Sequence, residues 1–260
     1  MKEVVTDVAI IGAGPIGLEL AVGLKRAGIE YLHFEKGQIA QTISQFPPQT
    51  RFFSSSERIA IAGVPIQKTD QAKCTREEYL SYLRSIVCQF GLEVYAYEPV
   101  TSLVRVETVG FAIRTQTSDG ERICRARSVV LAIGDMAGPR LLDIPGESLP
   151  HVSHYFEEPH KYFRRCVLIV GGKNSAVEAA LRCHHVGADV TVSYRRGQFD
   201  PKSVKHWLLP EIEGRIKRRE IHTHFSTQPV SIQPTHVTLA SVAGGDTFDV
   251  QADFVLLLVG

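Results

Sequence analysis

Residues 8–17 read VAIIGAGPIG, an apolar strand that runs into a glycine turn and opens a helix. Gly12 permits the tight turn, Gly14 lets the backbone come close to phosphates, and Gly17 lets helix and strand pack together. A second strand follows the helix and ends at Glu35, a carboxylate that can accept hydrogen bonds from ribose hydroxyls. This order predicts a binding site for the ADP half of a dinucleotide. A glycine turn that serves packing alone is the alternative.

A second unit of this kind occupies residues 167–176, where VLIV leads into GGKNSA. Lys173 stands at the position that Gly14 holds in the first turn and could offer its ammonium group to a phosphate. The next strand ends without an acid, and Arg195 and Arg196 stand where a ribose-binding carboxylate would be. Because a guanidinium grips phosphate bidentately, the arginines indicate the 2′-phosphate of NADPH; a solvated turn is the alternative. The first site is therefore expected to bind FAD and the second NADPH.

Composition favours a cytoplasmic enzyme that binds neither nucleic acid nor membrane. The chain has 260 residues, 29 basic against 28 acidic, and 44% of them are hydrophobic. No apolar run approaches the roughly 20 residues of a membrane span. The five cysteines form no C-x-x-C pair, as expected of structural thiols. Neither His151-x-x-His154 nor His222-x-His224 is completed by a further ligand, so no metal site is expected.

The fold class expected is α/β, with two Rossmann-like three-layer domains and β-meander crossovers. Residues 1–143 plus 251–260 are assigned to the FAD-binding domain and 144–250 to the NADPH-binding domain. The final strand, 254–260, resembles the apolar run 128–134 and is expected to re-enter the first domain. Other elements expected are a helix over 75–90 with the capping box Thr75-x-x-Glu78, and meander strands over 100–107, 110–116 and 122–127.

These motifs resemble those of flavoproteins with two dinucleotide-binding domains, the thioredoxin-reductase-like and ferredoxin–NADP-reductase-like enzymes. Within that group the chain is similar to the bacillithiol disulfide reductase family. The resemblance covers essentially the whole chain, and its markers are residues 12–17, FFSSS (52–56), IPGE (144–147), HYF (154–156), GGKNS (171–175) and WLLPE (207–211). It implies transfer of electrons from NADPH through FAD to an acceptor, which is a small disulfide, a quinone or a redox protein. A homo-oligomer, such as a dimer, is possible.

The candidate site residues all bind cofactor, and no catalytic side chain is assigned. Lys36 is expected near the phosphates or ribose, and Gly134 is expected to close over the flavin where a side chain would collide. The resemblance places Phe53, Ser54 and Ser55 at the approach to the isoalloxazine; an ordinary packed loop is the alternative. The full FAD set is Gly12, Gly14, Pro15, Ile16, Gly17, Glu35, Lys36, Phe53, Ser54, Ser55, Val100 and Gly134. The NADPH set is Gly171, Gly172, Lys173, Asn174, Ser175, Arg195 and Arg196.

Two departures from the resembling family shape the remaining expectations. The family's first glycine loop carries a cysteine at the position of Ile16, and isoleucine cannot form a mixed disulfide. Relatives also continue beyond the strand at 254–260, so a chain that ends at 260 is expected to have an incomplete flavin pocket. The alternatives are a flavin-dependent monooxygenase and a non-catalytic dinucleotide-binding remnant or redox sensor.

Overall fold

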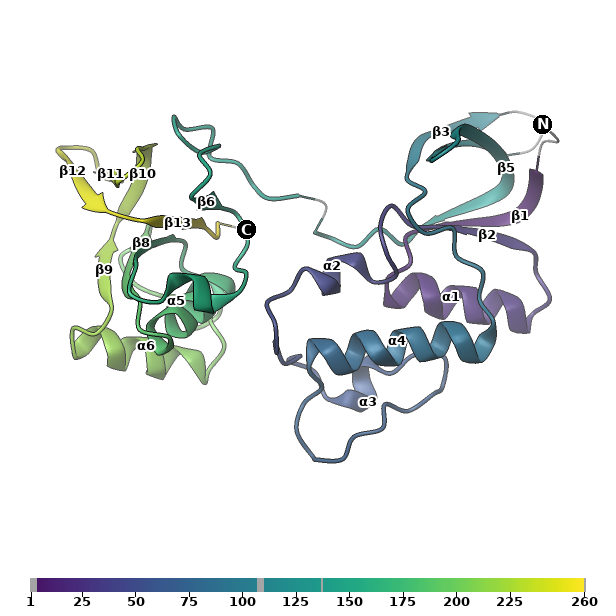
Figure 1. Ribbon diagram of the computed structural model, residues 1–260, viewed down its shortest axis with the longest axis horizontal. Coiled ribbons are helices and arrows are strands. Elements are labelled where there is room, and N and C mark those ends of the chain that lie inside the picture. Colours follow the sequence, from purple (N-terminus) through teal and green to yellow (C-terminus); the bar gives the residue numbers. More distant parts are fainter. Residues whose placement is uncertain (1–3, 107–109, 137, 260) are drawn as a thin grey trace. The chain divides into compact units, whose positions relative to one another are not determined.

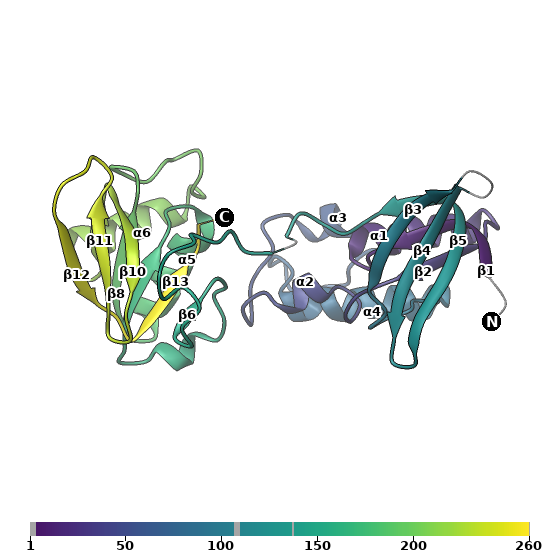
Figure 2. The same ribbon diagram turned by 90° about the horizontal axis from the view of Figure 1, so that it is seen from above.

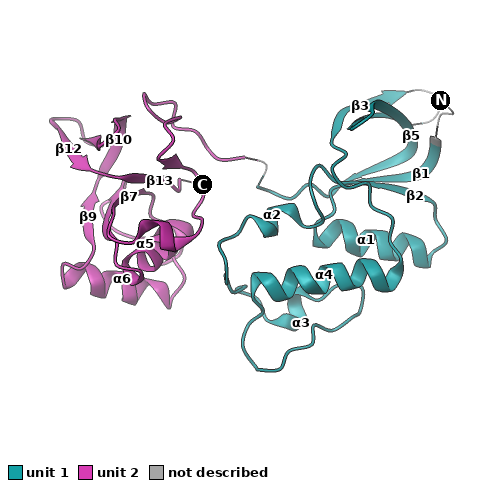
Figure 3. Ribbon diagram, viewed as in Figure 1, with its two compact units in different colours: residues 1–137 teal, residues 138–260 magenta. Residues whose placement is uncertain are grey.

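The computed structural model describes residues 4–106, 110–136 and 138–259, and the chain divides into two compact units, 1–137 and 138–260 (Figures 1 and 3). The expected strands 100–107 and 254–260 each end at a residue that lies outside the described ranges. Each unit combines a sheet that contains parallel strands with helices on one face and an antiparallel meander.

Unit 1 is built on a five-stranded sheet in the order β2-β1-β5-β4-β3. Strands β2 (Tyr31–Phe34) and β5 (Gly120–Leu131) run parallel to β1 (Val4–Ile11), whereas β4 (Gly110–Thr117) and β3 (Val100–Val106) complete an antiparallel meander. The expected strands over 122–127 and 128–134 form one strand, because β5 pairs with β4 at its start and with β1 from Cys124 onward.

Helices α1 (Pro15–Arg26) and α4 (Arg76–Phe90) lie on the same side of this sheet (Figure 1). Two short helices, α2 (Gln41–Ser44) and α3 (Ser56–Ile59), lie in the segment between β2 and α4. Strand β1 is apolar over residues 8–11, where side chains pack on both faces: Ile10 packs among the helices, and Ala9 packs beneath the meander. The expected capping box of α4 is confirmed, since Thr75 and Glu78 each bond the other's backbone N–H.

Unit 2 has a parallel five-stranded sheet in the order β6-β13-β7-β8-β9. Its strands are β6 (Val152–Ser153), β7 (Cys166–Val170), β8 (Asp189–Tyr194), β9 (His222–Phe225) and β13 (Phe254–Leu257). Helices α5 (Asn174–His185) and α6 (Leu208–Lys217) and the 3₁₀ helix η1 (Pro159–Tyr162) are in contact on one face. The antiparallel strands β10 (Thr227–Ile232), β11 (His236–Ser241) and β12 (Thr247–Gln251) pack on the other face (Figure 2).

The expectation that residues 251–260 re-enter the first domain was wrong. Strand β13 pairs with β7 residue by residue, from Phe254 beside Val167 to Leu257 beside Val170. It is the counterpart of the last part of β5, because each pairs in parallel with the strand that leads into the glycine turn of its own unit. The boundary also lies at residues 137–138 rather than 143–144. An apolar run shows that a strand is buried, but it does not identify the sheet that buries it.

Candidate functional site

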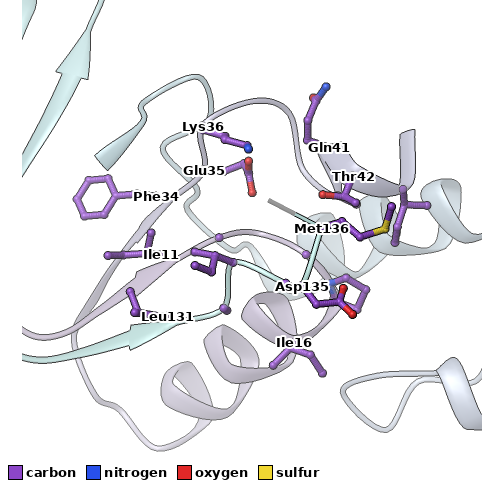
Figure 4. Close-up of a pocket in the computed structure, with 18 of the residues that line it drawn as sticks. Ile11, Ile16, Phe34, Glu35, Lys36, Gln41, Thr42, Leu131, Asp135 and Met136 are labelled. Carbon is purple, nitrogen blue, oxygen red and sulfur yellow. The ribbon is translucent and has the colours of Figure 1, made fainter. Parts of the chain in front are cut away.

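A cavity of about 740 Å³ opens in unit 1 where β1, β2 and β5 end, at Ile11, Phe34 and Leu131 (Figure 4). Ligands of open α/β sheets bind at this edge, beyond the carboxyl ends of the strands. Figure 4 shows Glu35 and Lys36 on one side of the cavity and Ile16 and Asp135 on the other. The cavity gathers these sequence-predicted residues: Gly12, Gly14, Pro15, Ile16, Glu35, Lys36, Val100 and Gly134.

The glycines of the first turn have different roles. Gly12 has a φ of +106°, and a side chain there would collide with the backbone carbonyl of Ala132. A side chain on Gly17 would collide with the Gly12 carbonyl and stand 3.1 Å from His33 Nε2. Gly14 has an ordinary φ of −75°, and among the described residues, its chain neighbours aside, no atom lies within 4 Å of the position a Cβ would take. The space beside Gly14 therefore belongs to the cavity, where a phosphate can approach the start of α1.

Glu35 lies at the end of β2 with only 8% of its surface exposed. Its Oε2 accepts a hydrogen bond of 2.7 Å from the Ala13 N–H, and its Oε1 accepts one of 3.1 Å from the Gly37 N–H. A carboxylate has about four acceptor positions, so two backbone donors leave room for ribose hydroxyls. The donor set therefore fits the ADP half of a dinucleotide: an acid for the ribose and a helix N-terminus for the pyrophosphate.

His33 is a polar residue of this site that the sequence analysis missed. It is fully buried in β2, and its Nε2 lies 2.9 Å from the Gly12 carbonyl oxygen. Burial lowers the pKa of His33, an effect partly opposed by its hydrogen bond to Gly12 and by the charge of Glu35. Its Nδ1 is buried without a hydrogen-bond partner among the described residues. The available signal was a histidine inside the otherwise apolar strand sequence YLHF.

Glu98 is a second missed residue, and it lines the cavity together with Val100. Only 7% of its surface is exposed. Its Oε1 accepts a hydrogen bond of 2.6 Å from Thr115 Oγ1 and lies 3.5 Å from Arg122 Nη1. The Arg122 guanidinium in turn lies over the ring of Tyr95. Glu98 thus joins the meander to the segment that follows β2.

Some predicted residues lie outside the lining of this cavity. The segment with Phe53, Ser54 and Ser55 is not part of it, and Lys73 donates a hydrogen bond to the Phe53 carbonyl and lies over its ring. Their contact with flavin stays a prediction. Gly134 does line the cavity, but in the part of the chain that the structure describes no atom beyond its chain neighbours lies within 4 Å of its Cβ position. Glycine is favoured there because its φ is +71°, a conformation that residues with side chains rarely adopt.

The ring of Tyr194 packs against the second glycine turn. Gly171 has a φ of +143°, and a side chain on Gly172 would collide with the ring of Tyr194. Lys173 is the exposed N-cap of α5, and Ser175 is exposed beside it. Asn174 Oδ1 accepts a hydrogen bond of 2.8 Å from the Lys205 N–H, so this side chain anchors a neighbouring loop. The turn itself remains at the start of a helix, as an anion site requires.

The two turns can be aligned through their hydrogen bonds. Gly12 N donates to Phe34 O at 2.7 Å, and Gly171 N donates to Ser193 O at 3.0 Å. The next residues correspond, so Tyr194 rather than an arginine occupies the place of Glu35, which corrects the sequence-based assignment. Arg195 corresponds to Lys36 and is exposed, with no partner recorded within the described ranges. Arg196 instead pairs with Asp200 at 3.3 Å.

The described ranges contain neither a membrane span nor a metal site. No helix there combines the length and apolar composition that a membrane span needs. No group of three histidine, cysteine, aspartate or glutamate side chains there has the arrangement of a metal site. The candidate sites are therefore the cavity of unit 1 and the second glycine turn of unit 2.

Comparison with known proteins agrees with this geometry. The family described as pyridine nucleotide-disulphide oxidoreductase matches residues 9–260. Bacilliredoxin reductase Bdr of Bacillus subtilis (strain 168) is 36% identical over 251 residues, which cover 96% of this chain and 75% of that protein. Bacillithiol disulfide reductase Bdr (YpdA) from Bacillus cereus superposes with a TM-score of 0.93 at 37% identity, covering 98% of this chain and 78% of that one. A flavin monooxygenase from Stenotrophomonas maltophilia shares the fold, with a TM-score of 0.77 at 20% identity over 99% of this chain and 79% of that one.

Proposed function

Because this chain belongs to the pyridine nucleotide-disulphide oxidoreductase family, we propose that it is an NADPH-dependent flavoprotein that reduces a small disulfide. Unit 1 binds FAD and unit 2 binds NADPH. The observation that carries the proposal is the pair of strand–turn–helix sites, of which the first opens onto a large cavity and ends at a buried carboxylate. A bound flavin would supply the redox chemistry, taking a hydride from NADPH and passing electrons to the acceptor.

The first unit offers every group that the ADP half of FAD needs. The open side of Gly14 admits the pyrophosphate to the N-terminus of α1. Glu35 presents its free lone pairs to the adenosine ribose, and Lys36 beside it supplies positive charge. The rest of the cavity is lined largely by apolar residues, including Ile16, Leu131, Ile133 and Met136, which suit a flat aromatic ring system.

The second unit favours a phosphorylated dinucleotide. Tyr194 stands where Glu35 stands in unit 1, so no carboxylate repels a 2′-phosphate at this point. Arg195 follows and is exposed, which leaves its guanidinium available for bidentate phosphate binding. Arg196 is engaged with Asp200 and so contributes mainly through longer-range charge. We therefore assign the 2′-phosphate to Arg195.

The acceptor is proposed to be a small disulfide because the similar protein from Bacillus cereus is named a bacillithiol disulfide reductase. The thiol route expected of the family is unavailable at Ile16, which lines the cavity with 71% of its surface exposed. Cys74, Cys124 and Cys183 are buried, and burial raises the pKa of each thiol, for Cys183 to about 12. Such cysteines are weak nucleophiles. The acceptor is therefore expected to be reduced without a thiol from the first turn.

The deciding experiment is the visible spectrum of the purified protein before and after anaerobic addition of NADPH. Flavin absorption bands that bleach with NADPH, and more slowly with NADH, are the expected result. Bacillithiol disulfide should then restore the bands under anaerobic conditions. A protein that shows no flavin spectrum even after incubation with FAD would refute the proposal, and NADPH binding by that colourless protein would favour the redox-sensor alternative. Oxygen uptake coupled to a hydroxylated product would favour the monooxygenase.

A further inference from the structure

One peptide group of the first turn is held at both ends by the same strand. The carbonyl of Gly12 lies 2.9 Å from His33 Nε2, and the N–H of Ala13 donates to Glu35 Oε2 at 2.7 Å. Both atoms belong to the peptide that joins Gly12 to Ala13. His33 and Glu35 are two residues apart in an extended segment, so their side chains point to the same side. The orientation of this peptide is therefore set from β2.

The hydrogen bond defines the state of the imidazole. A carbonyl oxygen only accepts, so His33 Nε2 must carry the proton. In the neutral ring Nδ1 is then an acceptor, and it is buried with no donor among the described residues. Leaving a buried acceptor unpaired is unfavourable. An aliphatic side chain would avoid this cost, so packing alone does not account for histidine at this position.

Unit 2 shows that an aliphatic side chain fits the equivalent position. The aligned hydrogen bonds of the two turns place Val192 of β8 where His33 stands in β2, and Val192 is buried in the core. Tyr194 likewise replaces Glu35. The second turn thus has the same backbone plan with neither member of the polar pair. The pair distinguishes the proposed site of a tightly held cofactor from that of a ligand that must leave after each turnover.

We propose that His33 is a positioning residue of the FAD site: its Nε2–H holds the Gly12 carbonyl inward, so that the glycine turn is shaped before the cofactor binds. This inference rests on the proposed function of unit 1. Glu35 cannot perform the task alone, because it holds only the N–H end of the Gly12–Ala13 peptide and makes no bond to the carbonyl end. His33 lies behind the turn, fully buried and outside the cavity lining, so a cofactor in the cavity does not compete for its bond to Gly12. A turn that is already shaped binds its ligand with less loss of conformational freedom.

The test measures FAD affinity of the flavin-free full-length protein by quenching of flavin fluorescence. His33→Val copies Val192 and removes the donor, and the loss of one net hydrogen bond should raise the Kd for FAD about fivefold to tenfold. His33→Gln keeps an N–H donor that can reach the carbonyl and should stay within about twofold of the wild type. Leu32→Val, on the opposite face of the same strand, should lower thermal stability and leave the Kd for FAD unchanged.

Further measurements separate positioning from folding. The Kd for NADP⁺ should be the same in all variants, because its site lies in unit 2. Nitrogen-15 NMR of the flavin-free protein should show His33 as the neutral Nε2–H tautomer. Wild-type FAD affinity in His33→Val, failure of His33→Gln to exceed His33→Val, or the Nδ1–H tautomer would each overturn the inference. If His33→Val does not fold, the FAD affinity of His33→Gln and the tautomer of His33 in the wild type test the inference. Failure of the wild type itself to bind FAD would instead reject the proposed function.

Discussion

The same substitution, glycine to alanine, should have opposite effects at two positions of the first turn. Alanine at position 17 brings a methyl group against the Gly12 carbonyl and within 3.1 Å of His33 Nε2. The first neighbour is backbone and the second is a fully buried side chain hydrogen-bonded to it, so α1 must move away from β1. Overpacking of this kind costs about 1–3 kcal/mol. At roughly 4 °C per kcal/mol for a domain of this size, the flavin-free unit 1 should melt about 4–12 °C lower.

Alanine at position 14 should leave the stability of the flavin-free protein nearly unchanged. Its φ is −75°, and no described residue other than its chain neighbours has an atom within 4 Å of the new methyl group. The poorer N-cap costs up to about 1 kcal/mol, and the smaller entropy of the unfolded chain returns about 0.4–1 kcal/mol. The methyl group does, however, occupy space beside the pyrophosphate. Loss of one charged hydrogen bond, about 1.5–3 kcal/mol, should raise the Kd for FAD roughly tenfold to hundredfold.

The assay compares thermal unfolding of the flavin-free proteins with FAD affinity by fluorescence quenching. Trp207 is the single tryptophan and lies in unit 2, so its fluorescence follows that unit, while circular dichroism follows the whole chain. Unit 2 should unfold alike in both variants. Unchanged FAD affinity in Gly14→Ala would show that phosphates do not approach this residue. An unchanged melting temperature in Gly17→Ala would show that the turn yields without cost.

Two further predictions concern charged side chains. Arg195→Ala should raise the KM for NADPH at least tenfold and barely affect the KM for NADH. Arg196→Ala should change the KM for NADPH only a few-fold, because Arg196 already pairs with Asp200. Steady-state kinetics with both nucleotides tests this, and equal effects of the two variants would contradict it. The Glu78 pKa is lowered to about 2, chiefly by its hydrogen bond from Lys68, so its contribution to stability is complete above about 4.5 and is lost as pH falls toward 2. In urea unfolding across this pH range, the free energy of unfolding should fall more steeply with decreasing pH in the wild type than in Glu78→Gln. Parallel plots of that free energy against pH would refute the assignment.

Much of the architecture could be predicted because its signals are local. The strand–glycine–helix units at residues 8–17 and 167–176 depend on apolar runs and on glycines that a tight turn needs, and both formed as strand, turn and helix. The capping box of Thr75 and Glu78 spans one helical turn and formed as well. The fold class follows from these repeated units, and comparison with the Bdr structure confirms it.

Other features depend on which segments meet in space. Residues 254–257 would suit any buried parallel sheet, and only pairing with β7 settled their place. Tyr194 follows Gly171 at the same separation at which Glu35 follows Gly12, and the hydrogen bonds of the two turns establish that the two positions correspond. His33 and Glu98 acquired a role only when folding brought Gly12 and Thr115 to them. Local sequence determines which segments form strands, turns and helices through short-range sterics and hydrogen bonds, whereas the partners of buried polar groups are decided by contacts between distant residues.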